Sequence, residues 1–290
     1  HRVDRRQRQM CIRDRIDVIA EILTQENPIL EDMNFVEGNL PTGHRTTIRT
    51  GLPTPTWRKL YGGVQPTKSN TAQVTDSCGM LEAYAEVDKA LADLNGNTAA
   101  FRLSEDRAHI EGMAQELAST IIYGNEGDQP EAFTGLAPRY NSLSAANADN
   151  IVSAGGSGSD NTSIWLVVWG DQTLHGIYPK GSRAGLDMQD KGQVTIENVD
   201  GSGGRMEAYR THYRHDCGLT VRDWRFAARV CNIDVSALTS DGTAADRAAA
   251  QKALINFMVQ ASERIPSLSK GRAVWYVNRT IRCLLYTSDA

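Results

Sequence analysis

The sequence predicts an α+β fold, in which helices and strands follow one another without the regular alternation of a parallel α/β protein. Three observations support this class. Two long segments have apolar residues at helical spacing, several segments are rich in β-branched and aromatic residues, and about forty residues near the amino end have no pattern for burying a core. The chain has 290 residues and no internal repeat, which is enough for about two domains or subdomains.

Four segments are expected to be helical. The first, from Ile16, has apolar residues at helical spacing until Pro28 ends the pattern. The third, after Ser104 as its N-cap and with acids in its first turn, carries one apolar stripe and stops at Gly124. The four segments are "IDVIAEILTQENPILEDM", "MLEAYAEVDKALADLNG", "LSEDRAHIEGMAQELASTIIYGN" and "AADRAAAQKALINFMVQASERIP".

The strands are expected mainly in the second half of the chain. "IVSAGGSGSDNTS" is predicted to be a loop, and a short turn around Asp171 joins the first two strands after it. The predicted strands are "IWLVVWG", "TLHGIYP", "GQVTIENV", "RMEAYRTHYRHDCGLTVRD", "WRFAARVCNIDV" and "RAVWYVNRTI".

The segment without a core pattern, from about residue 36 to 77, is predicted to be a long open β-hairpin. "HRTTIRTGLP" and "GGVQPTKSNTAQVTDS" flank a middle rich in proline and glycine. A two-stranded ribbon is marginal in water, so we expect a neighbouring subunit to order this arm. The candidate contacts with that neighbour are the aromatic and basic residues of its middle, namely Trp57, Arg58, Lys59, Tyr61 and Lys68.

The two ends of the chain are expected to be foreign to the protein. One back-translation of "CLLYTSDA" (283–290) has a reverse complement that encodes "RQMCIRD" (8–14), which indicates translated sequencing adaptor on opposite strands. The whole chain has a net charge of −4, but without the six basic and three acidic residues of these ends the remainder holds 25 basic and 32 acidic residues. That balance gives no general attraction to nucleic acid.

The cysteine spacing predicts reduced thiols, and the hydropathy predicts no membrane-spanning helix. Cys78, Cys217 and Cys231 are well spaced and suggest reduced thiols. No apolar run approaches the roughly 20 residues that a membrane-spanning helix needs.

No motif indicates catalysis or a bound cofactor. His212, His215 and Cys217 lie on a predicted strand without a partner motif for zinc, which favours solvated histidines over a metal site. The glycine-rich segments lack the Lys-Ser/Thr of a phosphate-binding loop, and no G-x-S-x-G or catalytic cysteine motif is present. The helical carboxylates are expected on solvated faces. Trp57 and Tyr61 beside Arg58 and Lys59 give weak support for stacking on single-stranded nucleic acid.

Several segments together resemble the major capsid proteins of tailed bacteriophages, in particular those of certain short-tailed phages. The resemblance spans about residues 16–281 in order, through the segments "NFVEGNLPTGHRTTIRTGLPTPTWRKLYGGVQPTKSNTAQV", "MLEAYAEVDKALADL", "IWLVVWGDQTLHGIYPKGSRAGL" and "GLTVRDWRFAARVCNID". It implies a Hong Kong 97-type fold and the role of a structural protein that self-assembles into the icosahedral head around phage DNA.

The resemblance also implies an organisation and a set of partners. Residues 16–35 would form the N-terminal arm and helix, 36–77 the extended loop, 78–150 the peripheral domain with its spine helix, and 151–281 the remaining peripheral strands and a truncated axial domain. Residues 1–15 and 282–290 would be adaptor. The partners would be the protein itself, in hexamers and pentamers, with scaffold, portal and decoration proteins, and DNA only non-specifically. The protein would be assembled in the host cytoplasm and reside in the virion.

The resemblance brings no enzymatic site. Some relatives crosslink through lysine and asparagine side chains, but nothing here identifies the acid that such chemistry needs at Lys59 or Lys68, so we predict none. Two other functions compete with the capsid role. A decoration protein or other assembly component would lack the long helix beside the arm, and a hydrolase would show a pocket with convergent, perturbed ionisable groups.

Overall fold

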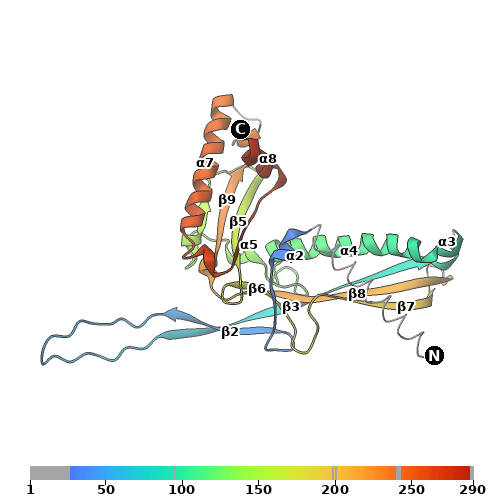
Figure 1. The fold of residues 1–290 in the computed structure, drawn as a ribbon, viewed down its shortest axis with the longest axis horizontal. Helices are drawn as coiled ribbons and strands as arrows, with labels where there is room; N and C mark the ends of the chain where they lie inside the picture. Colours follow the sequence, from blue (N-terminus) through green and yellow to red (C-terminus); the bar gives the residue numbers. More distant parts are fainter. Residues whose placement is uncertain (1–26, 95, 198, 200, 240–242, 288–290) are drawn as a thin grey trace. The chain divides into compact units, whose positions relative to one another are not determined.

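The computed structural model describes residues 27–94, 96–197, 199, 201–239 and 243–287 (Figure 1). These residues form two compact units. The first contains residues 27–37, Cys78–Arg139 and Gly176–Leu219, and the second contains Gly38–Ser77, Tyr140–His175 and residues 220–287. The helix predicted from Ile16 and the amino-terminal adaptor segment lie largely or wholly outside the described residues.

The first unit contains a three-stranded antiparallel sheet with β8 (Arg205–Val221) in the middle. β8 pairs with β3 (Asn70–Asp88) on one side and with β7 (Leu186–Glu197) on the other, which confirms β7 and β8 as strands over much of their predicted length. Of β3 and β8, only Cys78–Asp88 and Arg205–Leu219 belong to this unit.

One long helix covers the inner face of this sheet. α4 (Thr98–Tyr123) runs along β3 and β8 (Figure 1), and Ile110 and Met113 pack on Ala85 and Tyr213 in a cluster whose members are at most 5% exposed. The predicted apolar stripe of this helix is confirmed, because all its members are buried: Ile110, Met113, Ala114, Leu117 and Ile121.

The predicted start of this helix is wrong. Asn97 is the N-cap, and its side chain accepts a hydrogen bond from the Ala100 backbone N–H, whereas Ser104 lies inside the helix. The residues between them are mostly good helix formers, so the helix begins at the earlier of two suitable caps. Asp106 was expected on a solvated face but is only 3% exposed.

The helix predicted for "MLEAYAEVDKALADLNG" is also wrong over its first half. Met80 to Asp88 belong to β3, and only α3 (Lys89–Leu94) is helical. Alanine, leucine and glutamate favour a helix, but Ala85 and Val87 face the core while Glu82 and Glu86 do not, which is the period of a strand. Pairing with β8 along the whole segment outweighs the local preference.

The first unit also holds a short helix and a parallel strand pair. α2 (Pro28–Asp32) begins at Pro28, which therefore starts a helix rather than ending one, as its missing N–H allows at a first helical position. β1 (Phe35–Glu37) pairs in parallel with the end of β6 (Leu174–Tyr178). Phe35 lies against Gly176, where a Cβ atom would come within 2.7 Å of its ring.

The second unit is built on a four-stranded sheet. β5 (Asn161–Trp169) lies between β9 (Ala227–Asp234) and β10 (Arg272–Tyr276), antiparallel to both, and β4 (Ile151–Ser153) pairs with β9 in parallel. β4 corrects the prediction of a loop there, because Ile151 and Val152 are buried beside β9.

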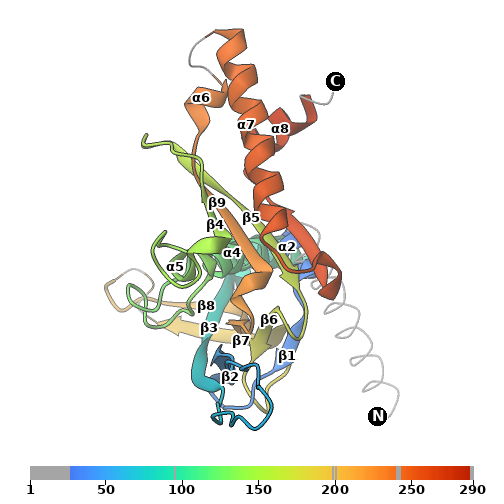
Figure 2. The same cartoon turned by 90° about the vertical axis from the view of Figure 1, so that its left-hand side faces the viewer.

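Two helices accompany this sheet. α7 (Ala244–Glu263) and α6 (Val235–Thr239) lie near the end of β9 (Figure 2), and α7 buries Leu254 and Ala261. Thr243 and Asp246 form a reciprocal capping box at the start of α7. Its predicted extent is confirmed.

The segments around this sheet differ from prediction at two points. Trp224–Phe226 form a 3₁₀ turn (η2) before β9, and the last predicted strand ends at Tyr276, followed by α8 (Arg279–Thr287). The buried Asn150, at the end of η1 (Ala148–Asn150), donates to the carbonyl oxygens of Arg225 and Ala227 at 3.0 and 2.8 Å and so fixes the start of β9.

The predicted hairpin is confirmed in the second unit. β2 (Gly43–Gly51) pairs antiparallel with Asn70–Ser77 of β3, and residues 52–69 connect them almost without regular structure (Figure 1). At its base, His44 lies 6.1 Å from the ring of His175, which is only 2% exposed. Burial is the main cause that lowers the pKa of His175, and the nearby His44 lowers it further.

Candidate interaction surfaces

The connection between the hairpin strands, residues 52–69, is an exposed segment with unusual chemistry, and we call it the arm tip. Its large apolar side chains are exposed to solvent: Leu52 is 77% exposed, Leu60 is 87% exposed, and Trp57 and Tyr61 are fully exposed. It has three basic residues and no acidic one, in a chain whose net charge is −4. A segment that exposes aromatic and basic groups together has the composition of a binding surface rather than of a solvated loop.

The five predicted contact residues all lie on the arm tip and are all exposed. Four of them surround one turn, in which the Gly62 N–H donates to the Lys59 carbonyl at 3.0 Å and Tyr61 has a left-handed backbone with φ of 61°. Lys68 lies on the returning side. Among the described residues, no hydrogen bond or ring contact joins these five side chains to one another, so any partner for them lies elsewhere.

The candidate metal cluster is divided between two faces of β8. His212 lies on the outer face, stacked on Tyr84 at 4.5 Å, with its Nε2 at 3.1 Å from a carboxylate oxygen of Glu82. His215 and Cys217 point to the other face and are buried. The alternation of these side chains is confirmed, but His215 is not a solvated histidine as expected. Within the described residues, no three potential ligands come together to hold a metal ion.

Burial explains the electrostatics of the two inner residues. It raises the pKa of the Cys217 thiol far above its usual range and lowers the pKa of His215. A thiol that stays protonated is a poor nucleophile and a poor metal ligand.

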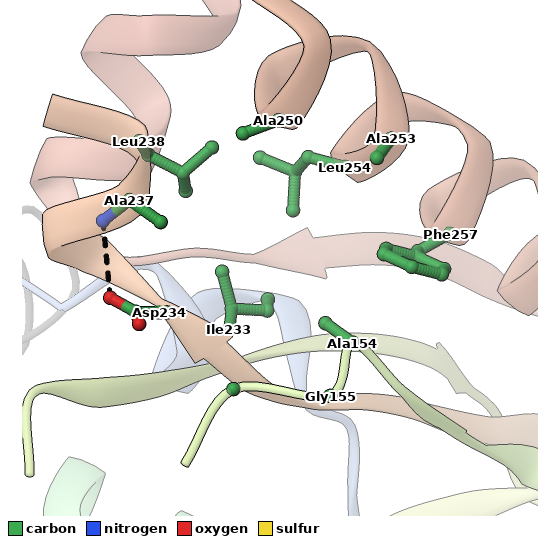
Figure 3. A pocket seen from close by; sticks show the side chains of 11 residues that line it. Ala154, Gly155, Ile233, Asp234, Ala237, Leu238, Ala250, Ala253, Leu254 and Phe257 are labelled. Carbon is green, nitrogen blue, oxygen red and sulfur yellow. Dashed lines mark hydrogen bonds between the residues drawn. The ribbon is translucent and has the colours of Figure 1, made fainter. Parts of the chain in front are cut away.

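A pocket of about 330 Å³ lies in the second unit under α7 (Figure 3). Leu254 and Phe257 of α7 cover it, Leu238 of α6 lies beside them, and Ile233 of β9 lies below. Among the described residues that line it, the one ionisable group is Asp234, whose carboxylate accepts hydrogen bonds from the Ser236 hydroxyl and the Ala237 N–H, which lower its pKa. These walls lack the convergent groups of perturbed pKa that the hydrolase alternative requires.

Two adjoining hollows lie in the first unit, and the sequence analysis did not predict them. The apolar hollow, of about 290 Å³, lies among β3, α4 and residues 129–133, and it is lined by Leu81, Leu117, Phe133 and Cys217 with Glu116 and Glu131 among its polar lining residues. The polar hollow, of about 300 Å³, shares Glu116, Thr120 and Gln129 with it and adds Asp128. The only feature of the sequence that could have indicated these hollows is the acid-rich segment "NEGDQPE" (125–131).

The acid-rich loop beside these hollows is closed by two glycines. The Gly135 N–H donates to the Gly124 carbonyl at 2.8 Å, and both residues are buried. A Cβ atom on Gly124 would lie 2.5 Å from the Phe133 carbonyl oxygen, and one on Gly135 would lie 2.5 Å from that of Thr120. Only glycine therefore permits this backbone approach.

The long helix packed on a sheet, the extended hairpin and the second sheet unit together define a shell-forming protein of the Hong Kong 97 type. A family model described as "Major capsid protein GP7" matches residues 13–289, and the chain belongs to this family. It is a structural subunit of a tailed-phage capsid, and its place is the virion shell. It forms that shell by self-association.

One solved structure supports this assignment. The chain is 43% identical to a chain in the near-atomic cryo-EM structure of bacteriophage Epsilon15, with a TM-score of 0.67 over 89% of this chain and 76% of that one. A chain of Mycobacterium phage Bobi is 11% identical (TM-score 0.45, covering 71% and 90%), and the encapsulin of Synechococcus elongatus is 13% identical (TM-score 0.46, covering 74% and 89%). At these scores the last two add nothing to the assignment.

No curated protein matches the chain. Among the described residues, no helix has the length and apolar character needed to span a membrane.

Proposed function

We propose that the arm, residues 36–77, holds the shell together by lying on a neighbouring subunit, with Trp57 as its anchor. The observation that supports this most directly is that Trp57 is fully exposed on a segment with the composition of a contact surface. Burying a large aromatic side chain contributes about 2–3 kcal/mol. The contribution recurs at every equivalent contact, so a modest energy per subunit becomes decisive in a closed shell.

The four other candidates complete this contact. Arg58, Lys59 and Lys68 are exposed and supply positive charge, and Tyr61 supplies a second aromatic ring. A patch that combines aromatic rings with arginine has the residue types that carry most binding energy at protein interfaces. The copies would join as hexamers and pentamers, and this role needs no catalytic site in the chain.

Limited proteolysis tests the arm. In the unassembled protein, proteases are expected to cut between about Pro41 and Lys68, because the arm tip is exposed, and assembly is expected to protect the same peptides. Cleavage at the same rate in both states would contradict the proposal.

Substitution tests the anchor. Trp57→Ala is expected to leave the free energy of unfolding of the subunit within about 0.5 kcal/mol of the original, since the side chain is fully exposed. It is expected to reduce particle formation, counted by electron microscopy. Trp57→Phe, which keeps an aromatic ring, is the matched control and should retain more assembly. A loss of several kcal/mol in subunit stability would instead place Trp57 in its own core.

A further inference from the structure

We infer that the apolar hollow of the first unit receives Trp57 from the arm of a second copy of this chain. The inference rests on the proposed function and adds the receiving site. Two features of the chain support it. The arm tip exposes the indole of Trp57 directly before Arg58 and Lys59, and the hollow combines an apolar floor with acidic lining residues.

The size and floor of the hollow suit a single aromatic side chain. At about 290 Å³ it lies at the lower limit of the roughly 300–1,000 Å³ typical of small-molecule sites. Its floor is made by Leu117, Phe133 and Cys217, which are only 3, 4 and 2% exposed. These side chains are fixed by the core, so the base of the hollow is preformed, and the exposed Met80 and half-buried Leu81 add accessible apolar surface to its lining.

The charges at the hollow complement those of the arm. Glu116 and Glu131 are exposed, and neither forms an ion pair with another described residue. Asp128 adds a third carboxylate in the adjoining polar hollow. Arg214, which contacts the sulfur of the lining residue Met80 at 3.5 Å, is paired with Asp216 at 2.8 Å. The lining thus keeps negative charge available for Arg58 and Lys59.

The alternatives fit less well. Trp57 is fully exposed, so the second unit of its own chain does not bury it. The pocket under α7 is apolar as well, but its carboxylate, Asp234, already accepts two hydrogen bonds and offers the cations no comparable acidic lining. A second copy therefore supplies the occupant that matches both the floor and the charge.

A photocrosslink locates the contact. Full-length protein carrying Trp57→p-benzoylphenylalanine is mixed with nitrogen-15-labelled unmodified protein, irradiated under assembly conditions and digested for mass spectrometry. The expected crosslinks join position 57 to labelled peptides containing Leu81, Leu117 or Phe133. Crosslinks to peptides containing Phe257, crosslinks only within one chain, or the absence of any crosslink between copies would each overturn the inference.

Charge exchange tests the lining independently of the photoprobe's chemistry. Glu116→Lys combined with Glu131→Lys, or Arg58→Glu combined with Lys59→Glu, should each weaken association between copies by about tenfold, equivalent to about 1.4 kcal/mol. A chain that carries all four substitutions should recover most of the lost association between copies. The matched control reverses Glu105 and Glu111, two exposed acids of α4 outside both hollows, and the arm reversal should not rescue it.

The two proposals fail differently. If assembly protects the arm but the crosslinks lie elsewhere and charge exchange gives no rescue, the arm clasps a neighbour at another site and only the hollow is excluded. If the arm stays equally cleavable in both states, the proposed function itself is wrong.

Discussion

Replacing Ala85 and its neighbour Tyr84 with the same residue, asparagine, separates a strand from a helix at the segment where sequence and structure disagree. In β3, Ala85 is 1% exposed against Ile110, whereas Tyr84 is 51% exposed on the outer face. A helix would have placed both on its inner side.

The expected costs follow from these two environments. Ala85→Asn buries an amide without a ready partner, at about 1–3 kcal/mol, and overfills a packed site, at about 1–3 kcal/mol. Its total is therefore about 2–6 kcal/mol. Tyr84→Asn mainly loses the stacking on His212, at about 0.5–1.5 kcal/mol.

Urea denaturation followed by circular dichroism measures both free energies of unfolding. Amide hydrogen exchange of α4 and β8 then shows whether it is the first unit that opens. The reasoning is refuted if Tyr84→Asn costs as much as Ala85→Asn, or more.

Three further predictions concern single residues. The lowered pKa of His175 means that the unfolded chain binds a proton which the folded chain excludes, so its contribution to stability is present above about pH 6.5 and is lost as the pH falls toward the lower folded pKa. The slope from His175 is at most about 1.4 kcal/mol per pH unit, and it should vanish in His175→Gln; an unchanged slope in denaturation from pH 7 to 5 would contradict this. Asn150→Ala leaves two carbonyl groups at the start of β9 without their donor and should cost about 1–3 kcal/mol in urea denaturation, against less than about 0.5 kcal/mol for the exposed Asn141→Ala. Gly176→Ala should disrupt the β1–β6 pair, seen as faster hydrogen exchange at Phe35, and unchanged exchange there would mean that the ring moves away at little cost.

The hairpin, the second-unit strands β5, β9 and β10, and the two long helices could be predicted from sequence because their patterns are local. The alternation in β2, the β-branched and aromatic residues of β5 and the apolar stripe of α4 can each be recognised within the segment itself. The five contact candidates could be chosen from the sequence because they are the aromatic and basic residues of the arm tip, although their role stays a prediction. The adaptor origin of the two ends also stays a prediction, and the family match extends from residue 13 to 289.

The sequence-based predictions were wrong where the structure of a segment depends on residues that are far from it in the sequence. Met80 to Asp88 have helix-forming side chains, and only the pairing with β8, far along the chain, makes them a strand. His215 appears solvated in a polar sequence, yet the helix that covers its face is remote in sequence. The two hollows could not be predicted for the same reason, since their walls come from β3, α4, β8 and the loop after α4.

The glycine closure at Gly124 and Gly135 separates what can vary in this protein from what cannot. Because the backbone contact between them holds both ends of the acid-rich loop, we expect substitutions at Glu131 to change the charge at the apolar hollow without disturbing the helix or strands that frame it. Related phages could therefore diverge in which arms their subunits accept while conserving one subunit fold. In a library of variants, we expect the loop to tolerate many side chains and the two glycines to tolerate almost none. Whether the capsid subunits of two coinfecting phages can assemble together would then depend on a few surface charges.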